Sequence, residues 1–229
     1  MERGLYIAAS GMLAEQARQD LIAHDLANAS TPGYKPDRVA STSFGDLLLS
    51  DTASGRPIGA LGLGTQIDRQ VTDTSPGPLH DTGEPLDFAV QGDGFFAVRT
   101  SAGVRYTRDG QFSASAGGTL VTAAGDDVLG PGGAPVRIGA GGTVAPSAIG
   151  VVALTNARRQ GDTLFTGTPG ATATATGTVR GGALEGSAVD PVHTMVEMLG
   201  SLRTFEAGQR VITTIDSTLG KAANQVGAV

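Results

Sequence analysis

The sequence has 229 residues, a length that fits one large domain or two small ones, and 40% of them are hydrophobic. Its formal net charge of −6 argues against nucleic-acid binding, which needs a basic face. The absence of cysteine excludes disulfides, thiolate catalysis and zinc held by cysteine. No run approaches the roughly 18 apolar residues of a membrane span, and the first residues lack the apolar core of a secretory signal. We therefore expect any export to proceed without a conventional cleaved signal.

Residues 3–29 follow a helical period and contain no proline. Spacings of three and four residues connect a thin stripe of mostly small or polar side chains: Leu5, Ala8, Met12, Glu15, Gln19, Ile22 and Leu26. The stretch DLANASTPGYKPD then ends this helix. Pro32 fixes φ, and Gly33 accepts the positive φ that a type II turn needs.

Glycine and proline mark a turn-rich middle of the chain, where 29 of the 35 glycines lie between Gly33 and Gly186. Short β-rich runs alternate there with turn sequences, and they read LDFAV, GFFAV, GVRYT, GTLVT, PVRIG and GVVALTN. The regular short spacing predicts a compact antiparallel β domain. The segment Gly170–Val179 alternates alanine and threonine and fits either an edge strand or an ordered loop. The segment Ser50–Gly64 fits either an ordered stiffening element or a slack loop.

The C-terminal zone begins with a helix-start signal, because Asp190 can cap and Pro191 fits the first helical position. More than thirty proline-free residues follow. Spacings of three and four residues connect Val192, Met195, Leu199, Leu202, Phe205, Gln209, Ile212, Asp216 and Leu219. The pattern indicates a coiled-coil-like seam, with Gly200 and Gly208 allowing close backbone approach, and a core helix of a globular domain fits it equally well.

The two terminal helices are natural partners, so the predicted fold class is α+β, with a helical inner domain and an inserted antiparallel β domain. We expect the helices to lie adjacent and antiparallel, with Leu5, Met12, Ile22 and Leu26 facing Leu199, Leu202 and Ile212. Because an isolated helix needs a packed face for stability, two thin seams should complete their burial against other copies or partner subunits. Before assembly we expect both ends to be largely disordered.

No motif indicates an enzyme. His24, His80 and His193 lie far apart, which disfavours a metal site. The glycines of Gly59–Gly64 have the wrong spacing for a dinucleotide loop, and Asp126-Asp127 lies in a glycine-rich turn. We expect no catalytic, metal or cofactor-binding residues, no nucleic acid and no small-molecule substrate.

Three separated motifs together resemble the bacterial flagellar rod and hook proteins. Residues Leu5–Lys35 are similar to the N-terminal motif of that family, including the Asp-Leu-Ala-Asn run that ends at Asn28 and the Thr-Pro-Gly-Tyr-Lys turn. The runs VQGDGFFAV and Tyr106–Gly130 resemble its β-domain signature, and Gly182–Ala222 resembles its C-terminal helix. His24-Asp25, Ser187-Ala188-Val189 and Phe205-Glu206-Ala207-Gly208 depart from the usual motifs. These departures leave the family unchanged but weaken the choice between the distal rod protein and its proximal paralogue.

The resemblance implies four segments: an N-terminal inner helix (1–33), an extended connector (34–78), a β-rich outer domain (79–186) and a C-terminal inner helix (187–229). The assembly residues would lie on the inner helices: Leu5, Met12, Ile22, Leu26, Asn28, Met195, Leu199, Leu202, Phe205, Ile212 and Leu219. Pro32, Gly33 and Tyr34 would form a hinge turn, with Tyr34 packed against a neighbouring subunit.

By the same resemblance, copies would stack into a hollow helical rod of the basal body that crosses the periplasm and transmits torque from motor to hook. The implied partners are copies of the same chain, adjacent rod and hook proteins, P- and L-ring or bushing components, and the flagellar type III export apparatus. A secreted β-rich binding module, or a hook-associated protein with a helical anchor, is the alternative function.

Overall fold

The computed structural model describes residues 2–43, 45, 47–50, 57–62, 64–161, 163–169 and 177–226. Two compact units divide the chain. The helix unit contains residues 1–26, 37–71 and 192–229, and the β unit contains residues 27–36 and 72–191. The turn that follows the first helix therefore belongs to the β unit.

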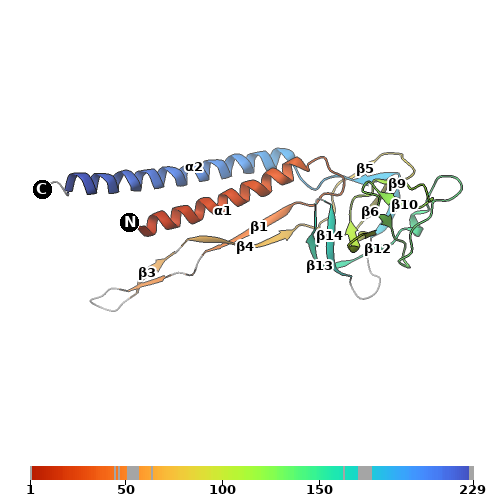
Figure 1. Cartoon of the computed structure of the whole chain (residues 1–229), viewed down its shortest axis with the longest axis horizontal. Helices are drawn as coiled ribbons and strands as arrows, with labels where there is room; N and C mark the ends of the chain where they lie inside the picture. Colours follow the sequence, from red (N-terminus) through yellow and green to blue (C-terminus); the bar gives the residue numbers. More distant parts are fainter. Residues whose placement is uncertain are drawn as a thin grey trace. The chain divides into compact units, whose positions relative to one another are not determined.

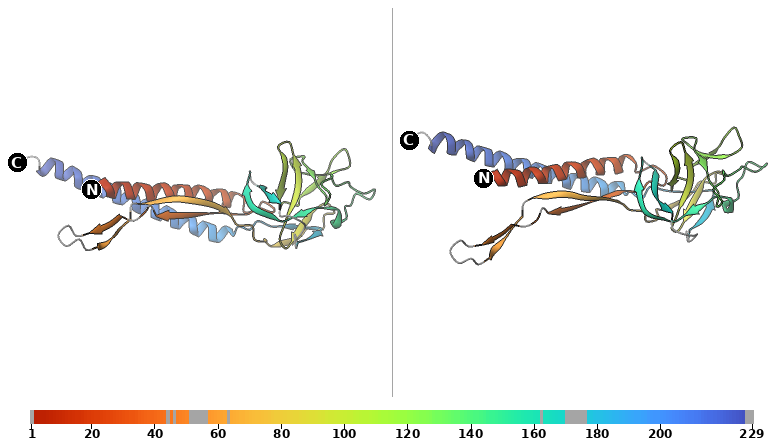
Figure 2. Two further views of the ribbon diagram at one scale, coloured as in Figure 1. Left: turned by 90° about the horizontal axis from the view of Figure 1, so that it is seen from below. Right: turned by 60° about the horizontal axis from the view of Figure 1, so that its bottom comes forward.

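Two long helices form most of the helix unit. They are α1 (Glu2–Ala27) and α2 (Pro191–Lys221), and one short stretch of π-helix, η2 (Ala222–Val226), follows α2. Helix α2 begins at the predicted proline, whose missing N–H costs nothing in the first turn. Figures 1 and 2 show α1 and α2 side by side, with the N- and C-termini at the same end of the pair, as expected for antiparallel helices.

The connector between α1 and the β unit forms paired strands, although the sequence predicted only an extended segment. Strand β1 (Asp37–Ser43) pairs with β4 (Thr65–Thr72), and β2 (Leu47–Ser50) pairs antiparallel with β3 (Pro57–Leu61). The Gln70 amide also donates to the Asp37 carboxylate at 2.8 Å. Strand β3 lies inside Ser50–Gly64, whose residues 51–56 and 63 lie outside the described residues.

The β unit is built from antiparallel strands, which Figure 1 shows in yellow, green and pale blue. The central sheet has the order β13-β14-β8-β7-β11-β10-β9, with β12 also paired to β7, and two further pairs are β15-β6 and β16-β5. The elements are β5 (Leu79–Asp81), β6 (Phe88–Gln91), β7 (Phe95–Thr100), β8 (Gly103–Thr107), β9 (Phe112–Ala114), β10 (Leu120–Thr122), β11 (Asp127–Val128), η1 (Pro146–Ala148), β12 (Val151–Val152), β13 (Leu154–Arg159), β14 (Leu164–Pro169), β15 (Thr178–Gly181) and β16 (Ala183–Glu185).

Strand β7 connects two apolar clusters because side chains alternate between the faces of a strand. Phe96 and Val98 point into the larger cluster, which also holds Phe88, Val90, Phe112, Leu120 and Val128. Phe95 and Ala97 point into the second cluster, with Tyr106, Leu129 and Phe165. The continuous apolar run FFAV is therefore buried on both faces, as is typical of a central strand.

Most of the predicted β runs form strands. PVRIG makes only isolated bridges, from Pro135 to Leu129 and from Arg137 to Thr119. The last strands of the β unit, β15 and β16, pair with β6 and β5, and β16 ends at Glu185. Of the ambiguous segment Gly170–Val179, residues 170–176 lie outside the described residues, and the last two belong to β15.

Candidate assembly site

Helices α1 and α2 make direct contact in the predicted antiparallel sense. The Ser201 hydroxyl donates to the Glu15 carboxylate at 2.6 Å. Near the other end of the pair, a Cβ built at Gly4 would lie 3.4 Å from Ile215. Since low residue numbers in one helix meet high numbers in the other, the expected antiparallel arrangement is confirmed.

The face of α2 that is buried or half-buried repeats every seven residues. Thr194, Ser201, Gly208 and Ile215 occupy one position, and Met198, Phe205, Ile212 and Leu219 occupy the other. Such a repeat keeps one side of a helix against its partner. Gly208 allows close approach, because a Cβ there would lie 2.8 Å from Cγ of Met12. Gly200, in contrast, is exposed with nothing within 4 Å of a built Cβ.

The residues of the predicted α2 seam lie on two different faces of the helix in the single chain. Phe205, Ile212 and Leu219 are half-buried, whereas Met195, Leu199 and Leu202 are exposed. Besides the half-buried large side chains, the face in contact with α1 includes the small residues Ser201 and Gly208, which let the two backbones approach. On α1, Ile22 is buried and Leu5, Met12 and Leu26 are half-buried. Asn28 lies in the following turn, where it accepts from the Thr31 hydroxyl at 3.0 Å.

The exposed side chains of α2 form a second apolar face, which we call the α2 stripe. It consists of Val192, Met195, Val196, Leu199 and Leu202, with exposed fractions from 39% to 72%. Spacings of three and four residues place these side chains along one side of about three helical turns. No other part of the described helix unit covers them.

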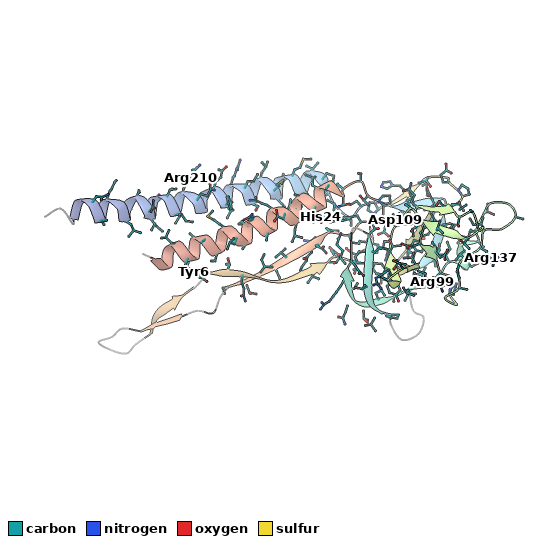
Figure 3. The ribbon with its side chains drawn as sticks, in the orientation of Figure 1. Tyr6, His24, Arg99, Asp109, Arg137 and Arg210 are labelled. Carbon is teal, nitrogen blue, oxygen red and sulfur yellow. The ribbon has the colours of Figure 1, made fainter. Side chains whose placement is uncertain are left out.

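A second exposed apolar surface lies between α1 and β4. A cleft of about 290 Å³ there is lined by residues that include Leu13 and Ile67, and by Tyr6, which is labelled in Figure 3. All three of these side chains are more than 40% exposed. A larger groove of about 790 Å³ lies between α1, α2 and the paired strands β1 and β4. The helix unit thus presents apolar surface on more than one side.

The turn after α1 has the predicted backbone but a different environment from the predicted one. Gly33 has a φ of +66°, the left-handed region that glycine tolerates. Tyr34 is completely buried within its own chain, and the Arg159 guanidinium lies 4.4 Å above its ring. The expectation that Tyr34 packs against a neighbouring subunit is therefore wrong. Pro32, beside it, is half-buried.

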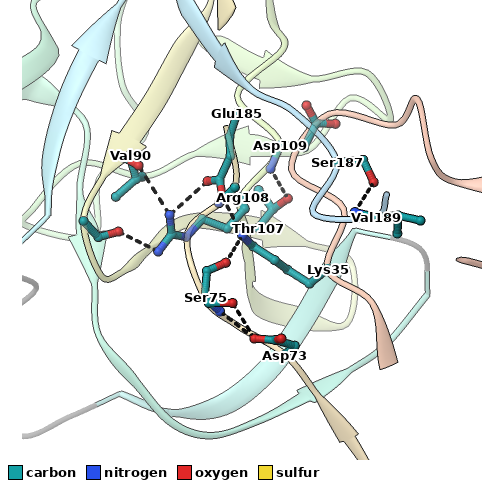
Figure 4. Close-up of polar contacts among 12 residues, drawn as sticks. Lys35, Asp73, Ser75, Val90, Thr107, Arg108, Asp109, Glu185, Ser187 and Val189 are labelled. Atoms are coloured by element: carbon teal, nitrogen blue, oxygen red, sulfur yellow. Dashed lines mark hydrogen bonds and ion pairs between the residues drawn. The ribbon is translucent and has the colours of Figure 1, made fainter. Parts of the chain in front are cut away.

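Next to Tyr34 lies a buried cluster of charges that sequence reasoning missed. The Lys35 ammonium donates to Oε1 of Glu185 at 2.5 Å, and the Arg108 guanidinium donates to Oε2 of the same carboxylate at 2.9 Å (Figure 4). All three side chains are at most 1% exposed. Burial lowers the pKa of Lys35 below its ordinary value, although the Glu185 carboxylate acts in the opposite direction.

No metal-binding group of histidines and carboxylates occurs among the residues whose placement is given, and within that same part of the chain neither helix is long and apolar enough to cross a membrane. The most distinctive feature of the described helix unit is its exposed apolar surface.

Comparison with known proteins identifies the family. Three family models match successive segments: "Flagella basal body rod protein" over residues 5–35, "Flagellar hook protein FlgE/F/G D1 domain" over 89–154, and "Flagellar basal body rod FlgEFG protein C-terminal" over 180–226. The flagellar basal-body rod protein FlgG of Bacillus subtilis is 32% identical, with 98% of this chain and 99% of FlgG aligned. The chain belongs to the flagellar basal-body rod protein family.

Relatives of the FlgF type match over equal lengths. FlgF of Caulobacter vibrioides is 30% identical over all of both chains, and FlgF of Salmonella typhimurium is 30% identical over 97% of each. The identities to FlgG and FlgF are nearly equal, so they place the chain in the shared family and in neither branch. The chain is a structural protein of the flagellar basal-body rod and not an enzyme.

Proposed function

We propose that this rod protein assembles by stacking its helix units, and that neighbouring subunits cover the α2 stripe. The observation that carries the proposal is that the five apolar side chains of the α2 stripe, all on one side of the helix, are exposed in a single chain. A contiguous apolar face of this kind is unusual on a monomer and typical of a surface that binds protein.

The existence of two separate apolar surfaces supports an open polymer rather than a closed dimer. The α2 stripe and the cleft between α1 and β4 lie on different elements. When two different patches pair head to tail, the assembly keeps one free patch of each kind at its ends, so it grows as a helix unless the rotation closes it into a ring. We infer a hollow helical homopolymer with the helices at the inner radius, acting as a drive shaft that transmits torque.

Family membership gives assembly with other rod and hook proteins, and we further propose the specific partners. Copies of this chain form most contacts, adjacent rod and hook proteins join at the ends, and P- and L-ring or bushing components surround the rod where they exist. The flagellar type III apparatus would deliver the chain across the cell envelope without a cleaved signal. The turn at Pro32, Gly33 and Tyr34 would set the direction in which the chain leaves α1.

The experiment that tests the proposal places a charge in the α2 stripe. Leu199→Lys should leave the single chain folded, since its side chain is 58% exposed, but should prevent filament formation. Gln209→Lys, at an exposed polar position of the same helix, is the matched control. Circular dichroism checks the fold, and sedimentation with electron microscopy detects filaments of uniform diameter. Filaments formed by Leu199→Lys as readily as by the control would refute a role for the stripe.

A further inference from the structure

The charged cluster of the β unit contains one carboxylate and two cations from three distant parts of the sequence. Glu185 is 150 residues from Lys35 and 77 residues from Arg108. Both carboxylate oxygens of Glu185 accept hydrogen bonds, Oε1 from Lys35 and Oε2 from Arg108. Oε1 also accepts from the main-chain N–H of Gly77 at 2.7 Å. Among the charged side chains drawn around the cluster in Figure 4, only Glu185 bonds to both cations.

The remaining hydrogen bonds of the two cations go to neutral groups. Lys35 donates to the main-chain oxygen of Ser75 at 2.6 Å, and Arg108 donates to those of Val90 and Gly92 at 3.3 and 2.8 Å. Asp73 also raises the pKa of Lys35, but less than Glu185 does, and its carboxylate accepts hydrogen bonds from Ser75. Without Glu185, two positive charges would therefore remain buried beside one another. Breaking a buried ion pair in this way costs far more than losing an exposed one.

Main-chain bonds place Glu185 and the turn after α1 together. The N–H of Gly33 donates to the carbonyl of Glu185 at 2.8 Å, and the N–H of Ala188 donates to the carbonyl of Tyr34 at 3.0 Å. Arg159 also donates to the carbonyl of Lys35. Residues 33–35 can be held in this way only when the segment that contains Glu185 is present.

We propose that Glu185 controls when the β unit folds. Until the segment just before α2 has docked and Glu185 neutralises Lys35 and Arg108, the β unit stays unfolded; we call this device the lock. The chain is synthesised from its N-terminus, so Lys35 and Arg108 are present long before Glu185. Until then, closing the sheet around Arg108 would bury an unpaired cation, and the open state is favoured. A subunit that must pass unfolded through an export channel, as the proposed function requires, would gain from this delay.

The first test compares a neutral isostere with a matched control in the full chain. Glu185→Gln should lower the folding equilibrium constant of the β unit roughly 100- to 3,000-fold. Asp81→Asn removes an ion pair of similar length, 2.7 Å to Arg180, but an exposed one, and should lower it less than about fivefold. Urea unfolding followed by tyrosine fluorescence reports this unit, since Tyr34 and Tyr106 are buried in it. Equal effects of the two substitutions would overturn the proposal.

A triple variant keeps the test decisive if Glu185→Gln fails to fold. Lys35→Met, Arg108→Met and Glu185→Gln together remove the whole charge cluster, and this chain should fold again, within about tenfold of the original equilibrium constant. A triple variant as unstable as Glu185→Gln alone would show that shape, not charge, is responsible, and would overturn the proposal.

The order of events is measured by pulsed hydrogen exchange during refolding. In the original chain, the amides of the β7–β8 ladder should become protected in the same phase as those of Gly33 and Ala188. In the triple variant, the ladder should become protected earlier than those two amides. Earlier protection of the ladder in the original chain would contradict the lock. Refolding is measured without assembly, so its outcome is independent of the filament experiment.

Discussion

The two units of this rod protein use their apolar residues in opposite ways. In the β unit, Phe88, Phe96 and Phe165 are completely or almost completely buried. In the helix unit, Tyr6, Leu13 and Leu199 are each more than half exposed. Burial of apolar area is the main favourable term in folding, so the β unit contains its own source of stability. In the helix unit much apolar area stays exposed in the single chain, so its burial would contribute free energy only on contact with neighbouring subunits.

The largest expected effect tests whether the β unit is stabilised by its own apolar core. Phe96→Ala removes a ring that packs edge-on against Phe112 at a centroid distance of 5.3 Å, and should cost about 3–5 kcal/mol of unfolding free energy. Leu199→Ala should change it by no more than about 0.5 kcal/mol, because the side chain is exposed. Urea unfolding of the full chain gives both values. Similar losses at both sites would end the contrast between the units.

The next effect concerns position 33, where the left-handed backbone and the crowded surroundings both favour glycine. A Cβ there would overlap the backbone of Arg108 and Asp109. Gly33→Ala should cost about 2–5 kcal/mol, the sum of strain at positive φ and overpacking. The matched control is Gly83→Ala, which has a φ of +74° but open space around its Cβ. Thermal unfolding should separate the two variants, and equal losses would show that the crowding is relieved without cost.

A smaller effect distinguishes the two glycines of α2. Gly200→Ala should stabilise the helix by about 0.5–1 kcal/mol, because alanine is the better helix former and the site is open. Gly208→Ala should lose this gain, because its Cβ would press on Met12. The helical signal at 222 nm during thermal unfolding measures both changes. If Gly208→Ala stabilised as much as Gly200→Ala, the seam between the helices would be looser than described.

The smallest effect is a pH dependence within the β unit. Burial raises the pKa of Asp109, with a further contribution from Asp87, while the main-chain N–H of Gln111 opposes the shift. The folded state therefore holds this proton to a higher pH than the unfolded chain, and stability falls as the pH rises from about 3.8 through the raised pKa. Asp109→Asn keeps an oxygen for Gln111 and should be more stable than the original chain at pH 7.

The gain from Asp109→Asn should shrink as the pH falls below about 3.8, because Asp109 then becomes protonated in the unfolded chain as well. Exposed Asp93→Asn serves as the control, and urea midpoints at pH 7 and pH 3.5 supply the comparison. A gain of the same size at both values would mean that the carboxylate charge is not the cause.

Local signals in the sequence predicted the helices and the positive φ of Gly33, because each depends on neighbouring residues. The pairing of the two helices was inferred instead from their matching thin stripes. Period and proline position locate α1 and α2, and the Pro-Gly pair specifies the turn. The buried face of α2 was found only in part. Phe205, Gly208 and Ile212 were in the predicted pattern and are half-buried, but buried Ser201 was not in it. A small polar residue gives no signal in a search for large apolar side chains, whereas exposed Leu199 does.

The charge cluster was beyond local signals, since its members come from three segments that only the tertiary fold joins. One signal does exist. In β16, Ala183 and Glu185 share the buried side of the strand, so a carboxylate occupies an inward position. A charge at such a position requires a buried partner, but nothing in the neighbouring sequence specifies Lys35 or Arg108.

The bonds between Gly33 and Glu185 and between Tyr34 and Ala188 also have a mechanical meaning. They join the segment where the chain first enters the β unit to the segment just before it finally leaves. A pull applied between residues 27 and 191 is carried first across this short bridge and its ion cluster, rather than through the strands of the central sheet. These bonds within the β unit must therefore break before such a pull loads the central sheet.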